Sequence, residues 1–145
     1  MRSVLGRLGA GVIVALSLVL AAALPAAAQT KLDPNNTLYL DTPYGRVVIA
    51  LRPDIAPKHA ERLKKLSREG FYNGVPFHRV IPGFMAQTGD GQYGNGTGGS
   101  KYPDLPAEFS NVPFERGTVG MARASSPNSA NSQFFIMFDA TPSLN

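Results

Sequence analysis

The stretch FHRVIPGFMAQTGD, residues 77–90, decides how the rest of this chain is interpreted. Side chains alternate across a β-strand, so Phe77, Arg79 and Ile81 are expected to share one face. Arg79 is then a fixed cation beside aromatic and aliphatic surface. Such a face is suited to binding an amide carbonyl that lies next to an apolar ring.

A second long block, GTVGMARASSPNSANSQFFI, spans residues 117–136. Taken together and in this order, the two blocks resemble the cyclophilin family of peptidyl-prolyl cis/trans isomerases, in particular its Gram-negative periplasmic type. The resemblance runs from about Thr37 to Asn145. It implies a mainly β fold, a closed antiparallel barrel of eight strands capped by two helices. About six of those strands and one helix are expected in this chain, without the closing strands and the second helix.

The remainder of the chain agrees with a mainly β protein. The predicted elements are a hairpin over residues 38–53, a helix over 57–68, two short strands within 77–87, and strands near 118–121 and 133–138. Pro57 suits a first helical turn, and Gly70 suits a helix C-terminus. No strand and helix repeat alternates along the chain, so a parallel doubly wound sheet is not expected.

Burial is predicted from the same periodicities. The helix is expected to place its charges on a solvated face, through Lys58, Arg62, Lys65 and Arg68. Core positions are expected at Leu38, Leu40, Val48 and Phe134, with Ile136 also facing inward and Phe135 facing the other way.

The N-terminal segment has the pattern of a secretory signal. Arg2 and Arg7 precede an apolar run over residues 9–24, which Pro25 and three alanines follow. Cleavage is expected after Ala28. An uncleaved anchor is the alternative, because the run approaches the roughly 20 apolar residues that span a bilayer.

These patterns divide the chain into a signal peptide at residues 1–28, a polar leader at 29–36 and one isomerase domain at 37–145, incomplete at its C-terminus. The formal charge of +4 falls to +2 without the signal, so charge does not indicate a nucleic-acid partner. The chain has no cysteine, which fits an oxidising compartment and the cytosol equally. On the signal alone we expect a periplasmic or secreted protein, with no membrane attachment after cleavage. We also expect it to be a monomer. If the protein ends at Asn145, unpaired strand edges should make it prone to aggregation.

Arg79 is the expected catalyst. Rotation about a peptide bond has a barrier of ~18–20 kcal/mol, because the nitrogen donates its lone pair into the carbonyl. A guanidinium directed at the prolyl nitrogen favours a twisted, pyramidal nitrogen, and an apolar pocket strengthens this effect by excluding water. A surface arginine without function is the alternative interpretation.

The resemblance implies further site residues. Gln87 is expected to hydrogen-bond Arg79, as the matching glutamine does in cyclophilins. The proline pocket is implied to consist of Phe84, Met85, Phe135 and Leu144. Backbone groups of Ala122, Arg123 and Ala124 are implied to bind substrate as an added strand.

Two positions depart from the family pattern. Arg123 stands where many members have asparagine, which is expected to shift the preference for residues preceding proline. Ser143 stands where many eukaryotic members have tryptophan, so only weak cyclosporin binding is expected.

Other candidate sites are not supported. Gly94, Gly96 and Gly99 satisfy G-x-G-x-x-G, yet no strand leads into them, so no dinucleotide cofactor is expected. His59 and His78 lack metal-ligand spacing, and no metal is expected. His78 is predicted to be a packing histidine with satisfied ring nitrogens.

The sequence therefore predicts an isomerase of X-Pro bonds in folding or extended polypeptides, which are its expected partners. The alternative is a non-catalytic, chaperone-like binder of proline-containing segments. A third possibility is that the chain has no stable fold.

Overall fold

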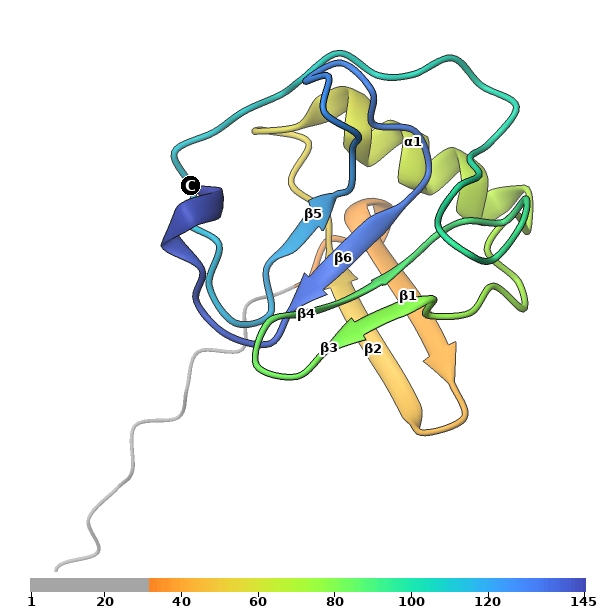
Figure 1. Ribbon diagram of the computed structural model, residues 1–145. Helices are drawn as coiled ribbons and strands as arrows, with labels where there is room; N and C mark the ends of the chain where they lie inside the picture. Colours follow the sequence, from red (N-terminus) through yellow and green to blue (C-terminus); the bar gives the residue numbers. More distant parts are fainter. Residues whose placement is uncertain (1–31) are drawn as a thin grey trace, which may run out of the picture. The chain divides into compact units, whose positions relative to one another are not determined.

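The computed structural model describes residues 32–145, which form a mainly β unit with one α-helix, α1 (Figure 1). The predicted signal peptide and the first residues of the leader lie outside the described residues. The strands are β1 (Thr37–Thr42), β2 (Gly45–Ala50), β3 (Arg79–Ile81), β4 (Met85–Thr88), β5 (Val119–Met121) and β6 (Phe134–Met137). Helix α1 spans Pro57–Arg68, and two 3-10 turns span Pro34–Asn36 and Pro142–Leu144.

Strands β1 and β2 form the predicted hairpin. Leu38 pairs with Ile49 on its inner face, and Ile49 lies in the core. Tyr39 pairs with Val48 on the outer face, where these side chains are 60% and 46% exposed. The predicted core position of Val48 is therefore wrong, because the pleat that directs Ile49 inward directs Val48 outward.

Helix α1 has the predicted bounds, but its N-terminus is capped by a residue far along the chain. Ala56 at the N-cap has no side-chain acceptor. Instead the Glu108 carboxylate accepts the backbone N–H groups of Lys58 and His59, each at 3.1 Å, and lies 2.7 Å from His59 Nδ1. Burial would raise the pKa of Glu108, but these hydrogen bonds outweigh burial and hold the pKa below its ordinary value. These hydrogen bonds hold the segment around Glu108 against the N-terminus of α1.

Arg62 corrects the prediction that the helix charges are solvated. Its side chain is buried, and the residue is only 9% exposed. The guanidinium donates to the Pro103 carbonyl at 2.8 Å and to the Asn131 carbonyl at 3.1 Å. A buried cation needs such acceptors. The helical pattern does not reveal them, because they belong to loops that fold over the helix from later in the chain.

The four remaining strands form one antiparallel sheet in the order β3-β4-β6-β5. Phe134 lies in the core with Ile49 and Leu63, and Ile136 packs against them, which confirms the predicted inward positions. Val119 packs on the same core face. The opposite face of the sheet carries Arg79 and is described below.

Within residues 32–145 the strands do not close into a barrel. No hydrogen-bonded strand pair joins the β1-β2 hairpin to the four-stranded sheet. The same residues include no helix with the length and apolar character that a membrane crossing requires.

Candidate active site

A row of four residues crosses the sheet on the face opposite the core. Arg79 on β3 is paired with Gln87 on β4, Gln87 with Phe135 on β6, and Phe135 with Gly120 on β5. Residues that are directly opposite in adjacent strands point to the same side of the sheet. The register of the backbone therefore places a cation, an amide, an aromatic ring and a glycine side by side. We call this row the sheet wall.

Arg79 is held by a chain of side-chain amides. Its Nη1 donates to Gln87 Oε1 at 3.3 Å, which is the contact expected from the sequence. Gln87 Nε2 donates in turn to Gln133 Oε1 at 2.9 Å. Gln133 Nε2 donates to the carbonyls of Gly96 and Gly98 at 3.0 and 2.8 Å. The guanidinium is thereby connected, through two glutamines, to the backbone of a distant loop.

Gln133 was not among the sequence-predicted site residues. A signal for it exists, because Gln133 lies two residues before Phe135 and the strand period of two puts both on one face. The sequence alone does not show that its amide reaches the glycine-rich loop.

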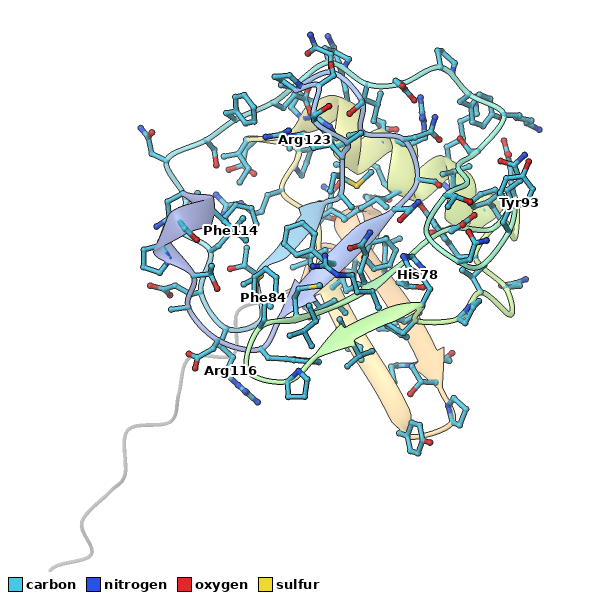
Figure 2. All side chains as sticks on the ribbon, in the orientation of Figure 1. His78, Phe84, Tyr93, Phe114, Arg116 and Arg123 are labelled. Atoms are coloured by element: carbon cyan, nitrogen blue, oxygen red, sulfur yellow. The ribbon has the colours of Figure 1, made fainter. Side chains whose placement is uncertain are left out.

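The sheet wall borders a cleft of about 1300 Å³, whose lining also extends to the core face of the sheet, at Val119 and Ile136, and to the core residues Ile49 and Leu63. The four residues assigned to a proline pocket all line this cleft: Phe84, Met85, Phe135 and Leu144. Met85 is 2% exposed and forms part of the floor rather than an open wall. In Figure 2, Phe84 and Phe114 lie on the side of the sheet nearer the C-terminal turn, and His78 lies on the opposite side.

Gly120 makes room for the aromatic part of the cleft. The rings of Phe114 and Phe135 stack with centroids 5.7 Å apart and planes at 25°. A Cβ on Gly120 would lie 2.6 Å from Phe114 Cε1 and 2.6 Å from Phe135 Cζ. The absence of a side chain at Gly120 therefore lets both rings cover this end of the sheet wall.

The segment predicted to bind substrate by its backbone is only partly available. Ala122 and Arg123 line the cleft. The N–H groups of Ala122 and Ala124 are already bonded, to the Gln133 carbonyl and to Ser129 Oγ, both at 2.9 Å. The N–H and C=O of Arg123 have no hydrogen-bond partner among the described residues. An added strand would therefore pair at Arg123.

The glycine-rich loop over residues 89–99, which we call the loop wall, contributes Asn95 and Gly96 to the lining of the cleft. Its shape depends on one buried carboxylate. Asp90 is 1% exposed and accepts backbone N–H groups at 2.9 to 3.2 Å from Gln92, Tyr93, Asn95, Gly96 and Gly98. This residue was not singled out from the sequence, where it is one acidic residue before a run of glycines.

The loop hydrogen bonds determine the protonation state of Asp90. Burial would raise its pKa, but the N–H groups of Tyr93, Gly98, Gly96 and Asn95 outweigh burial and hold the pKa far below the ordinary aspartate value. Asp90 is therefore ionised throughout the neutral and mildly acidic range.

His78 corrects a prediction. Both of its ring nitrogens are buried, and neither has a hydrogen-bond partner among the described residues. The ring packs against Gly96, where an added Cβ would lie 2.9 Å from His78 Cδ2. The side chain fills space between the loop wall and the start of β3, but its polar atoms are not satisfied as expected.

The charged groups around the cleft are mostly arginines. Arg52 is paired with Asp54 at 2.6 Å, and the Glu108 carboxylate is engaged by His59 and the start of α1. Arg79 and Arg123 have no carboxylate partner within residues 32–145. The same residues hold no cluster of histidines and acids that would bind a metal ion.

This arrangement is suited to acting on an amide bond without a nucleophile. An apolar cleft can hold a ring, and Arg79 presents a fixed cation at its edge. Arg79 is exposed in the structure, so a bound substrate has to cover it before exclusion of water can strengthen its electrostatic effect.

The sequence and the fold both have known relatives. Residues 37–145 match the model of the family described as "Cyclophilin type peptidyl-prolyl cis-trans isomerase/CLD". A probable peptidyl-prolyl cis-trans isomerase of Brucella suis is 66% identical over 123 residues, which cover 78% of this chain and 63% of that protein. A peptidyl-prolyl cis-trans isomerase of Synechococcus elongatus is 43% identical over 72% of this chain and 70% of its own length.

A solved structure extends the comparison to three dimensions. It is a cyclophilin type peptidyl-prolyl cis-trans isomerase of Cryptosporidium parvum, crystallised in the presence of the dipeptide Ala-Pro. The TM-score is 0.71 at 34% identity, over 75% of this chain and 72% of that one. This chain thus spans 63% of the length of its Brucella relative and more of the other two. From its sequence and its fold, the chain belongs to the cyclophilin family of peptidyl-prolyl cis-trans isomerases.

Proposed function

We propose that this protein accelerates cis-trans rotation about X-Pro bonds in extended or folding polypeptides. The observation that carries the proposal is the position of Arg79 at the edge of an apolar cleft, held by Gln87 and Gln133. A relative in the same family was crystallised with Ala-Pro, which supports a proline-containing ligand for the cleft.

The proposed mechanism uses the cation and the apolar surface together. Phe84, Phe135 and Leu144 hold the prolyl ring, while Arg79 donates toward the prolyl nitrogen. That hydrogen bond withdraws the lone pair from resonance with the carbonyl, so the amide twists more easily. Gln87 and Gln133 restrict the guanidinium to this orientation, which avoids reorganisation during the reaction. Arg123 adds backbone hydrogen bonds to the substrate segment that precedes proline.

Substituting Arg79 tests the proposal. We expect Arg79→Ala to lower kcat/KM on an X-Pro test peptide by ~100-fold or more, which corresponds to about 2.7 kcal/mol of transition-state stabilisation. Arg79→Lys should retain little of the activity, because the ammonium group of lysine does not reproduce the planar array of donors of a guanidinium. Arg116→Gln is the matched control, since Arg116 is exposed and does not line the cleft. Activity of Arg79→Ala within a few-fold of the unmodified protein would remove the mechanism.

The same variant separates catalysis from simple binding. A chaperone-like binder of proline-containing segments needs the pocket but not the cation. Under the proposed function, Arg79→Ala loses isomerisation while its affinity for a proline-containing peptide is partly retained. An unmodified protein that binds such peptides without accelerating their isomerisation would establish the binder instead.

Several finer expectations belong to this proposal. The protein is a periplasmic or secreted monomer of the periplasmic cyclophilin type, released by cleavage after Ala28. N-terminal sequencing of exported protein should begin at Gln29, whereas Met1 on membrane-bound protein would favour the anchor. We expect the two sheets to be parts of the closed barrel of the family, which the strands of residues 32–145 do not complete by themselves. Cyclosporin binds weakly because Ser143 lacks an indole, and Ser143→Trp should tighten its binding.

A further inference from the structure

Arg123 has a hydrogen-bonding edge that its own loop does not use. Its Nη1 donates to the carbonyls of Ala124 and Ser125 at 2.9 and 3.2 Å. These bonds fix the direction of the guanidinium. Nε and Nη2, which form the other edge of the planar fork, have no partner among residues 32–145. That edge has the spacing that binds both oxygens of a carboxylate.

The position of Arg123 makes this edge accessible to a bound peptide. The residue lines the cleft, and its side chain is exposed. Its backbone N–H and C=O have no hydrogen-bond partner among the described residues, whereas the N–H groups of Ala122 and Ala124 already donate hydrogen bonds within the protein. A peptide that adds a strand here would place one residue directly opposite Arg123. Side chains of directly opposite residues in antiparallel strands lie about 4.5–5.5 Å apart at Cβ, within reach of the guanidinium.

The charges around Arg123 favour an acidic side chain at that position. Arg79 is the other guanidinium of the cleft without a carboxylate partner in the described part of the chain. The one carboxylate of the lining, Glu108, is already hydrogen-bonded to His59 and Lys58. A peptide carboxylate opposite Arg123 would thus meet a cation with a free edge, and the described lining of the cleft holds no free carboxylate that would repel it.

We propose that Arg123 gives the cleft a preference for substrates with aspartate or glutamate at one of the two positions before proline. The inference rests on the proposed function, because it assigns the substrate class of the same cleft. Arg123 acts on the substrate side chain and is a specificity-determining residue, separate from Arg79, which acts on the amide.

The test uses matched peptides and the full-length protein. Peptides with Glu, Gln or Lys at the first or the second position before proline are compared by kcat/KM at low salt. We expect Glu to exceed Gln by about three- to fivefold at the position opposite Arg123, as for a partly exposed ion pair. Added salt should lower this ratio. Arg123→Gln should bring it close to one, and Arg123→Glu should reverse it in favour of Lys.

Arg116→Gln is the control, because it removes the same charge from a side chain that also donates to a backbone carbonyl, that of Phe138. Figure 2 shows Arg116 at one end of the sheet and Arg123 at the other. The control should keep the Glu to Gln ratio. Ratios near one at both positions, or a ratio that Arg123→Gln leaves unchanged, would overturn the inference.

If the protein has no isomerase activity, the preference for acidic substrates can still be tested by measuring binding. If no peptide is isomerised, the same ratio is measured as the relative affinity of the Glu and Gln peptides by NMR titration. Tighter binding of the Glu peptide that Arg123→Gln abolishes would support the specificity without the catalysis. Equal affinities would overturn it.

Discussion

The two walls of the cleft are built in different ways. The sheet wall depends on the backbone ladder of four strands, which aligns Arg79, Gln87, Phe135 and Gly120 whatever their side chains are. The loop wall depends on a single carboxylate, Asp90, which gathers five backbone N–H groups. Removing a side chain from the sheet wall should therefore change chemistry more than stability. Removing Asp90 should change the shape of the site itself.

The largest loss of stability is expected at the loop wall. Asp90→Asn replaces an ionised acceptor with an amide that has one acceptor oxygen and two donors, so several buried N–H groups lose their partner. We expect the free energy of unfolding to fall by about 3 kcal/mol, measured by urea denaturation. Asp54→Asn, at an exposed carboxylate paired with Arg52, is the control and should cost far less. A stable Asp90→Asn variant would mean that glycine geometry alone shapes the loop wall.

Gly120→Ala probes the sheet wall by crowding it. The new methyl group would meet the rings of Phe114 and Phe135, which must move. Overpacking of this kind costs about 1–3 kcal/mol, and we expect about 2 kcal/mol together with a raised KM. Adding Phe114→Leu, which replaces one of the two rings with a smaller aliphatic side chain, should recover part of both losses. If Gly120→Ala binds peptide normally, the rings do not form the pocket as described.

Gln133→Ala tests the connection between the walls. It removes the hydrogen bond to Gln87 and the two bonds to the loop carbonyls, so stability should fall by about 1–2 kcal/mol. We expect kcat/KM to fall roughly tenfold, because Arg79 is less well oriented. Gln92→Ala is the matched control, since Gln92 bonds within the loop and does not reach Arg79. Equal effects of the two substitutions would show that the walls act independently.

The smallest effect is expected in mild acid. The folded pKa of Asp90 is lowered, so the unfolded chain binds more protons and the contribution of Asp90 is complete above the ordinary aspartate value of 3.8. That contribution declines only as pH falls below 3.8 toward the folded pKa. Urea midpoints measured from pH 7 to pH 3 should stay nearly constant to about pH 4.5, fall slightly below it because the pKa values of Glu69 and Glu108 are also lowered, and fall further below pH 3.8 as the contribution of Asp90 declines. Asp90→Asn should show a shallower decrease, which comes from Glu108 and the other acids.

The sequence predicted the elements that local patterns specify. The hairpin and the bounds of α1 follow from alternation, from Pro57 and from the apolar period of the helix. The strands near Arg79 and Phe134 also lie where they were expected. The contact between Arg79 and Gln87 was expected only because the sequence resembles a known family. The residue types by themselves do not show that Arg79 pairs with the residue eight positions later.

Two of the misplaced or missed residues, Arg62 and Gln133, depend on segments far away in the chain. Arg62 looked like part of a solvated helix face, but loops from around residues 103 and 131 cover it. Asp90 and Gln133 looked like ordinary polar residues. The role of Gln133 comes from the glycine-rich loop, whose Gly96 and Gly98 carbonyls lie 37 and 35 positions before it. The partners of Asp90 lie only two to eight residues after it, and the path of the loop turns their N–H groups toward its carboxylate.

The sequence by itself therefore determined the order and type of the elements and the cationic, apolar character of the face around Arg79, because strand and helix periods arise from interactions over a few residues. Only the tertiary structure decided which face of β2 is buried, which arginines are enclosed and which remain available to a ligand. These choices depend on hydrogen bonds and packing between residues that lie up to 69 positions apart, as Arg62 and Asn131 do. The fold brings such partners together, and the local pattern of residues carries no signal for them.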